Sequence, residues 1–194
     1  MRIPMLLLSA YGLTLAAPLD AAELTPLLGY SGGGNFTNTA SAQSVSAESS
    51  IANGVLLGWY AAPDKQYELL YSEQQTTVGP ANTRLRFQYL QLGGNYFYQG
   101  QRQPWSPFVA GGLGITRINP AVPDSHSTLR LSLSIAAGAR WRISERLGLR
   151  LEVRGHATLM NNRSTVICDS GCTLAIDGDA LYQLQGTIGL GYRF

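Results

Sequence analysis

The chain has 194 residues, a length that suits a single domain. Only 13% of its residues are charged, against roughly 25% in a typical soluble domain, and 22 residues are glycine. The formal net charge of +2 comes without a clustered basic stretch, which argues against a nucleic-acid-binding protein.

The first residues have the features of an export signal. Arg2 supplies a positive start, and the apolar stretch after it has the length of a signal-peptide core but is too short for a transmembrane helix. Small residues follow at Ala21 and Ala22, where we expect cleavage. Residues 1–21 would then form a signal peptide and residues 22–194 the mature domain. A buried N-terminal helix is the alternative interpretation of this stretch.

Eight segments of the mature chain alternate apolar and polar residues with period two, the pattern of a β-strand. Most of them are long enough to cross a membrane at a tilt. The last segment is the clearest, because its apolar face ends in Tyr192 and Phe194. The predicted strands cover about residues 24–36, 51–61, 66–76, 84–98, 107–118, 128–143, 147–160 and 181–194.

The alternation changes phase inside the fourth predicted strand. Leu85, Phe87 and Tyr89 share one face, and the apolar series then continues on the other face from Leu90. A β-bulge would explain this change, and so would a misplaced strand boundary.

The connections between the predicted strands differ in length. Three short turns lie at one end, around residues 63–65, 100–104 and 144–146, whereas the connections at the other end are polar and mostly longer. Bacterial outer-membrane barrels show this pattern, with the short turns on the periplasmic side. With an even number of strands, both termini would lie in the periplasm. Residues 37–50 are rich in Ser, Ala and Thr and are a candidate for disorder.

Aromatic residues support this topology. Strands two, four, six and eight would all descend to the same end, and each finishes with aromatic side chains. Amphipathic rings favour the headgroup level of a membrane, so we predict an interface girdle at this end. Its members are Trp59, Tyr96, Tyr98, Trp141, Tyr192 and Phe194.

The two cysteines of the chain, Cys168 and Cys172, lie four positions apart in a polar segment. In an exported protein such a pair is expected to form a disulfide that closes a small loop. A two-cysteine metal site is the alternative, but no histidine lies nearby. We predict neither a metal ion nor a cofactor.

The polar faces of the strands are expected to point into the barrel. An eight-stranded barrel has an interior just wide enough for side chains to fill, so charged residues there should pair with one another. We therefore predict a packed polar plug. Arginine outnumbers the acidic residues on these faces, so a narrow anion-preferring channel is the alternative. The predicted network comprises Glu68, Arg130, Arg140, Arg150, Glu152 and Arg154.

A lipid-modifying enzyme is a further alternative. His156 and Thr158 faintly resemble the His–Ser pair of outer-membrane lipid A deacylases, although threonine replaces the serine. The alternation also points His156 into the lumen, away from lipid. A hydrogen-bonded lumen histidine is the simpler interpretation, and we predict that the protein is not an enzyme.

As a whole, the mature chain resembles the small outer-membrane β-barrel family of the OmpA/OmpX type. The resemblance rests on the signal segment, Leu92–Tyr98, Pro107–Gly114 and Gly191–Phe194. It implies an eight-stranded antiparallel up-and-down transmembrane β-barrel in the outer membrane of a Gram-negative bacterium. It also implies insertion by the barrel assembly machinery, which would recognise the C-terminal strand by Tyr192 and Phe194.

The leading hypothesis is a non-enzymatic barrel with a polar-plugged lumen that presents extracellular loops for structural or surface-interaction roles. Its expected partners are outer-membrane lipid, lipopolysaccharide, the assembly machinery and an extracellular ligand bound by the loops. Residues 161–179, with the cysteine pair, would form the most ordered contact surface.

Overall fold

A computed structural model provides the structure of the chain. The predicted signal peptide and both cysteines, Cys168 and Cys172, lie outside the residues that it describes. Within the described residues, no helix is long and apolar enough to cross a bilayer. The structure describes residues 22–33, 35–38, 44–46, 48–78, 83–98, 104–120, 127–160, 165–167, 173–175 and 180–194.

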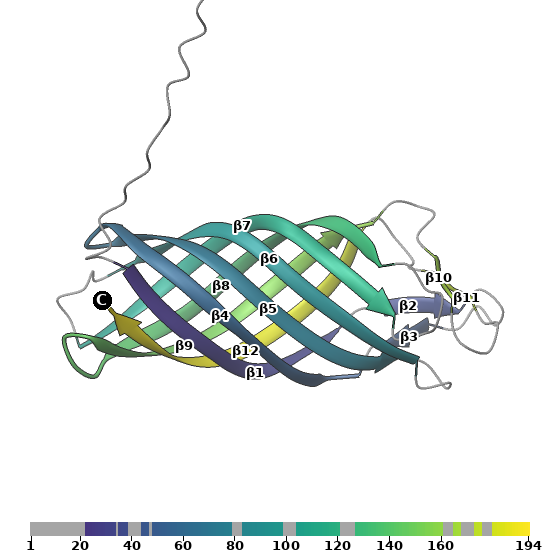
Figure 1. Ribbon diagram of the computed structural model, residues 1–194, viewed down its shortest axis with the longest axis horizontal. Coiled ribbons are helices and arrows are strands. Elements are labelled where there is room, and N and C mark those ends of the chain that lie inside the picture. The colour runs from purple at the N-terminus through teal and green to yellow at the C-terminus, as the bar shows by residue number, and fades with distance from the viewer. Residues whose placement is uncertain are drawn as a thin grey trace, which may run out of the picture.

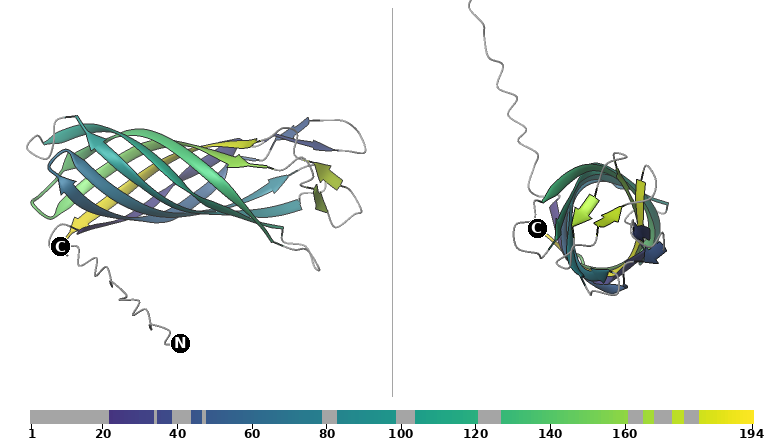
Figure 2. Two further views of the ribbon diagram at one scale, coloured as in Figure 1. Left: turned by 90° about the horizontal axis from the view of Figure 1, so that it is seen from above. Right: turned by 90° about the vertical axis from the view of Figure 1, so that its right-hand side faces the viewer.

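Eight long antiparallel strands close into a barrel, as predicted (Figure 1). Each of these strands pairs with its neighbours along the chain, and the pairing of the first with the last closes the ring. Seen along its axis, the wall is a single round layer (Figure 2). The barrel strands are β1 (Ala22–Gly33), β4 (Ser50–Ala62), β5 (Lys65–Val78), β6 (Thr83–Phe97), β7 (Trp105–Pro120), β8 (Thr128–Arg142), β9 (Leu147–Leu159) and β12 (Ala180–Arg193).

The two ends of the barrel differ. At one end, which we call the turn end, β4 passes to β5 and β8 passes to β9 through short turns. The first and last residues of the barrel also meet there, since the Phe194 amide donates to the Ala22 carbonyl at 3.0 Å. We call the opposite end the loop end.

A small second sheet stands at the loop end (Figures 1 and 2). It joins the segment after β1 to the segment after β9, through backbone pairing of Asn38 with Leu174. Its strands, in spatial order, are β10 (Thr165–Ile167), β11 (Thr173–Ala175), β2 (Asn35–Asn38) and β3 (Ser44–Ser46).

This sheet corrects two sequence predictions. The strand predicted over residues 24–36 ends at Gly33, whose φ of 97° is a conformation that favours glycine and turns the chain out of the barrel. In the segment 37–50, a candidate for disorder, residues 37–38, 44–46 and 50 belong to β2, β3 and β4, and residues 39–43 and 47 lie outside the described residues. Period-two alternation does not show where one sheet ends and another begins, so this boundary was missed.

The structure also explains the change in apolar alternation inside the fourth predicted strand. β6 keeps one continuous register with β5 and with β7, so neither neighbour records a bulge there. Leu85, Phe87 and Tyr89 are buried and point into the lumen, whereas Leu90 is exposed on the wall. The phase changes because the loop half of the lumen takes apolar side chains from β6, and the backbone stays regular.

The outer wall of the barrel is apolar. Ile135 is 77% exposed, Leu131 66% and Leu113 64%, whereas Ser134 and Ala136, the neighbours of Ile135 along the strand, are buried. Large apolar side chains are exposed in this way on all eight barrel strands. A wall with this character suits hydrocarbon surroundings and would be costly in water.

Aromatic side chains mark both ends of this wall. At the turn end the rings of Tyr96 and Tyr98 lie edge to face, with centroids 5.5 Å apart, and those of Tyr192 and Phe194 do the same at 5.3 Å. Trp141 pairs across the strands with Trp105, and Trp59 with Tyr67. Toward the loop end, the sequence analysis missed two further exposed rings, Tyr30 and Tyr182.

We predict that Ile135→Arg destabilises the barrel in a lipid bilayer by about 2–4 kcal/mol, because Ile135 is the eighth of the fifteen residues of β8 and faces outward at mid-wall. The matched control, Ile143→Arg, places the same charge on an exposed residue at the turn end and should cost about 0–1 kcal/mol. Urea unfolding in vesicles measures both. Equal, small effects would contradict a lipid-facing wall, since an exposed isoleucine of a soluble protein tolerates arginine.

Candidate functional site

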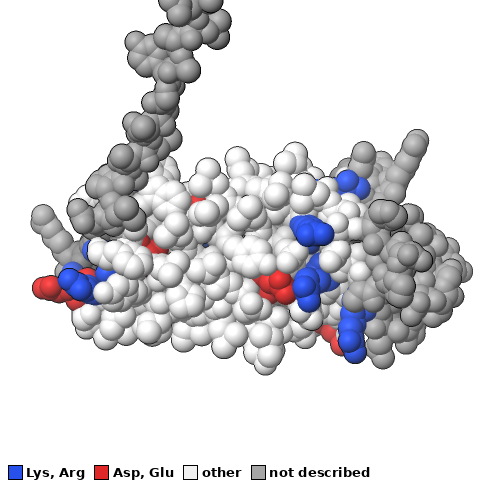
Figure 3. All heavy atoms as spheres, in the orientation of Figure 1, with Lys and Arg blue, Asp and Glu red and all other residues white. Residues whose placement is uncertain are grey.

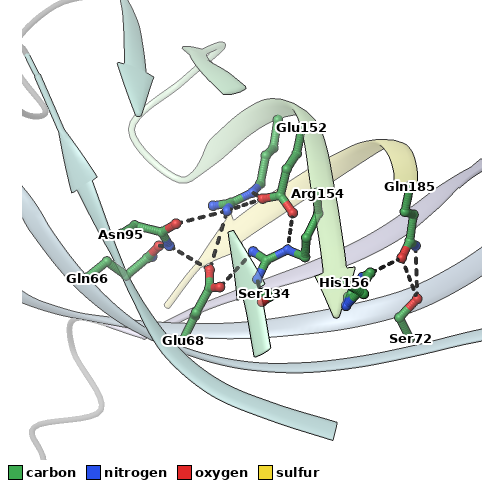
Figure 4. A network of polar contacts seen from close by, with 10 residues as sticks. Gln66, Glu68, Ser72, Asn95, Ser134, Glu152, Arg154, His156 and Gln185 are labelled. Carbon is green, nitrogen blue, oxygen red and sulfur yellow. Dashed lines mark hydrogen bonds and ion pairs between the residues drawn. The ribbon is translucent and has the colours of Figure 1, made fainter. Parts of the chain in front are cut away.

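Four charged side chains form a ring in the middle of the lumen (Figure 4). The Glu68 carboxylate accepts hydrogen bonds from Arg154 Nη2 at 2.7 Å and from Arg150 Nη2 at 3.4 Å. The Glu152 carboxylate accepts hydrogen bonds from Arg154 Nε at 2.6 Å and from Arg150 Nε at 3.0 Å. Charges alternate around the ring, and its formal sum is zero.

The ring connects opposite sides of the barrel. Glu68 lies on β5, whereas Arg150, Glu152 and Arg154 are successive inward residues of β9, four places away around the eight-stranded wall. Strand alternation puts the three β9 residues on one face. The salt bridges from Glu68 therefore span the lumen.

Neutral partners complete the ring. Asn95 donates to Glu68 Oε2 at 2.8 Å and accepts from Arg150 Nη2 at 3.1 Å. Arg154 Nη1 donates to Ser134 Oγ at 3.1 Å, and the Arg150 guanidinium lies 4.1 Å from the centre of the Phe108 ring. These contacts pair charged groups that would otherwise be very costly to bury, although Arg150 Nη1 has no hydrogen-bond partner among the described residues.

A second charged group lies at the turn end of the lumen. Arg140 Nη2 contacts Glu23 Oε2 at 2.6 Å, and Arg140 Nη1 donates to the Tyr60 hydroxyl at 2.6 Å. Tyr60 in turn donates to Glu23 at 3.0 Å, and the Arg193 guanidinium lies 4.4 Å from the centre of the Tyr60 ring. This group has one carboxylate for two guanidiniums.

The structure therefore divides the predicted lumen network. Glu68, Arg150, Glu152 and Arg154 form the central ring, whereas Arg140 bonds to Glu23 instead. Arg130 lies near the loop-end terminus of β8, and its Nη1 is 3.5 Å from the Leu129 carbonyl oxygen. The sequence placed all six side chains on the inward faces of the strands, but this did not show which arginine pairs with which glutamate.

The sequence analysis missed several polar partners. Glu23 lies one residue before the predicted start of the first strand, although it is in phase with Thr25, which is also buried. Asn95 and Gln66 share the inward phase of their strands and are hydrogen-bonded at 3.0 Å. Strand alternation could have identified Glu23, Asn95 and Gln66, because every inward-facing position of a narrow barrel is buried.

His156 and Thr158 do not form a nucleophile–base pair. His156 Nε2 lies 3.1 Å from Gln185 Oε1, and its ring stacks on Tyr89 with centroids 4.2 Å apart. The Thr158 hydroxyl is instead hydrogen-bonded to Thr116 at 3.0 Å. Both residues are buried in the lumen, so this geometry supports no ester hydrolysis at the lipid face.

Apolar side chains also pack inside the barrel, among buried polar residues such as Gln74, Gln91 and Gln183. Phe97 and Phe108 pack together toward the turn end, with centroids 5.6 Å apart. A buried cluster of Leu27, Leu56 and Leu70 lines the β1, β4 and β5 side. Among the described residues, no group of three His, Cys, Asp or Glu side chains is placed to hold a metal ion.

Comparison with known proteins identifies the architecture. No family model matches the chain. The curated proteins give no match either. Solved structures are similar: neisserial surface protein A, NspA, superposes with a TM-score of 0.66 at 11% identity, covering 89% of this chain and 97% of its own.

Two proteins of Pseudomonas aeruginosa are similar as well. The outer membrane protein OprG has a TM-score of 0.57 at 13% identity, with 90% of this chain and 97% of OprG covered. The N-terminal barrel domain of OprF has a TM-score of 0.51 at 14% identity, with 90% and 98% covered. The fold is therefore that of the small eight-stranded outer-membrane β-barrels.

We predict that Glu68→Gln destabilises the protein by about 3–5 kcal/mol, because it leaves Arg150 and Arg154 buried with one carboxylate fewer. The control, Glu73→Gln, makes the same change at a partly exposed pair with Arg86 and should cost about 0–1 kcal/mol. Urea unfolding of both variants in the same vesicles tests the difference. Equal effects would show that the ring does not stabilise the fold.

Proposed function

We propose that the protein is a non-enzymatic integral outer-membrane barrel with a closed lumen. It would hold the loop-end sheet and its connections outside the cell. The central ring is the observation that carries this proposal. It ties β5 to β9 across the lumen of a barrel whose outer wall is apolar.

The burial of the ring favours a closed barrel over an anion channel. Arg150 is 1% exposed, Arg154 2% and Glu68 1%. Guanidiniums that lined a water-filled pore would be accessible to water. The equal number of arginines and glutamates in the ring also gives an anion little net attraction at this depth.

Fold likeness and wall chemistry support the proposed location. Two of the three similar structures reported above are named as a surface protein, NspA, and an outer membrane protein, OprG. The turn end, which holds both termini of the barrel, would face the periplasm, as in barrels with short periplasmic turns. The aromatic residues of the turn end, including the assembly signal Tyr192 and Phe194, would then lie at the inner interface.

The loop end would supply any contact with an extracellular partner. The segments that follow β1 and β9 are joined there through β2 and β11, so two loops share one small sheet. A disulfide between Cys168 and Cys172 would add a covalent restraint to the second segment. We propose a structural or surface-interaction role for this sheet.

We predict that the refolded wild-type protein shows no unit conductance steps in planar bilayers, because the lumen is filled by buried side chains. A general porin in the same chamber serves as the positive control. Folded protein is verified beforehand by heat-modifiable gel migration. Steady anion-selective steps from pure protein would replace this proposal with the channel.

We predict opposite accessibility for tags at the two ends of the barrel. An epitope inserted between residues 123 and 124 should be stained on intact cells, whereas one inserted between residues 144 and 145 should be stained only after permeabilisation. Both insertions fall in connections between strands. The reverse pattern would overturn the orientation, and no staining of membranes would overturn the location.

A further inference from the structure

One sector of the outer wall is charged. On most strands the exposed side chains remain apolar close to the loop end, as at Ile51 and Leu129. On β6 and β7 they change to arginine: Arg84, Arg86 and Arg117 are all exposed. In Figure 3 basic and acidic side chains gather toward the loop end, and the wall between the two ends carries very few.

The strand register places the three arginines together. Arg84 and Arg86 are two residues apart on β6, so both point outward on the same strand. Arg117 on β7 pairs with Gln88, the next outward residue of β6. Residues two apart on a strand and diagonal pairs across strands are separated by roughly 7 Å. Arg86 is therefore near both other arginines, whereas Arg84 and Arg117 lie about 14 Å apart, a distance that an anion with two separated charged groups could span.

Neighbouring groups organise the patch. Glu73 accepts from Tyr71 at 3.0 Å and from Gln88 at 2.9 Å, and it lies 3.5 Å from Arg86 Nε. Arg117 donates to Ser127 at 3.3 Å. A cavity of about 600 Å³ adjoins the patch, and Arg84, Arg86, Glu48 and Asn119 are among the residues that line it.

The charge of this patch is positive. Glu48 accepts a hydrogen bond from the Thr77 hydroxyl at 2.6 Å, and Glu73 is held by Tyr71 and Gln88. Three arginines against these two carboxylates leave a formal charge of +1. A guanidinium presents a planar set of donors that matches phosphate oxygens.

Apolar surface continues directly below the arginines. Leu90 and Leu92 are the next large exposed residues of β6 toward the turn end, and Leu113 is exposed beside them on β7. A ligand on this surface would meet cations at one end and hydrocarbon-like wall at the other. This combination matches an anionic lipid better than a soluble anion.

We infer that Arg84, Arg86 and Arg117 bind the phosphate groups of outer-leaflet lipid A, with its acyl chains on Leu90, Leu92 and Leu113. This inference rests on the proposed orientation, which places the loop end in the outer leaflet. The site takes one lipid against one sector of the barrel. Elsewhere the apolar wall meets lipid without a comparable cluster of outward arginines among the described residues.

The test compares two triple variants with the same change of charge. R84Q/R86Q/R117Q removes the patch, and K65Q/R142Q/R146Q removes three exposed cations at the turn end. Each protein is refolded in uncharged detergent micelles and titrated with bisphosphorylated lipid A, with native mass spectrometry as the readout. We expect R84Q/R86Q/R117Q to bind bisphosphorylated lipid A about 100-fold more weakly than the wild type, because each arginine contributes roughly fivefold to the affinity. The turn-end variant should remain within about twofold of the wild type.

Two further arms identify the ligand chemistry. Dephosphorylated lipid A should bind the wild type and the patch variant equally weakly, and inorganic phosphate should not compete, because it lacks the acyl chains. E73Q removes a carboxylate from the patch and should tighten binding of bisphosphorylated lipid A severalfold. Since a merely structural role of Glu73 would not strengthen binding, this gain is specific to the site.

Several outcomes would overturn the site. They are equal losses in the two triple variants, equal binding of the two forms of lipid A, and displacement of the lipid by a soluble polysulfated saccharide. With all proteins migrating as folded barrels, these outcomes leave the proposed function intact. If R84Q/R86Q/R117Q does not fold, R117Q alone should weaken binding about fivefold, and unchanged binding refutes the site. A wild type that never folds in lipid overturns the proposed function and this site with it.

Discussion

The pairing of β1 with β12 is the constraint on which the structure depends. In hydrocarbon an unpaired backbone amide or carbonyl costs several kcal/mol, so a strand sheet survives there only when it has no edge. The register from Glu23 opposite Arg193 to Gly33 opposite Gln183 removes that edge. Closing eight strands also fixes the width of the interior. The inward side chains must then fill a narrow space, and the outward ones must suit lipid.

The central ring follows from this narrowness. Inward residues on opposite strands come within contact distance only because the barrel is small, which is how Glu68 on β5 reaches Arg150 and Arg154 on β9. Buried charges are tolerated when each is paired and hydrogen-bonded, and the ring meets this condition with Asn95 and Ser134. Phe97 and Phe108 pack against each other toward the turn end, and the Phe108 ring also lies against the Arg150 guanidinium. The charges therefore behave as a core cross-link of the barrel.

Period-two alternation made the strand number, the topology and the outward face predictable from sequence, because each depends on local pattern. Contacts across the lumen were not predictable. Arg140 and Arg150 share the same phase and chemistry, yet Arg140 meets Glu23 and Arg150 meets Glu68. The difference depends on strand tilt and stagger, which no single strand encodes. The phase change in β6 was ambiguous for a different reason. Leu85, Phe87 and Tyr89 are buried inside the barrel, so an apolar side chain does not by itself mark the outward face of a strand.

The arginines of the barrel thus have two different environments, and the difference bears on how the wall meets its membrane. Inside, Arg150 and Arg154 are matched one to one by glutamates, so the central ring contributes no net charge. On the outer wall, three arginines outnumber the carboxylates beside them: Arg84, Arg86 and Arg117. They lie near the loop end of β6 and β7, where the apolar part of the wall ends on these two strands. On β8 the apolar part of the wall continues through Leu129, which pairs directly with Arg117. The apolar height of the wall therefore changes between two adjacent strands. A flat bilayer cannot match both heights at once, so either the barrel tilts or a charged headgroup reaches down to the arginines.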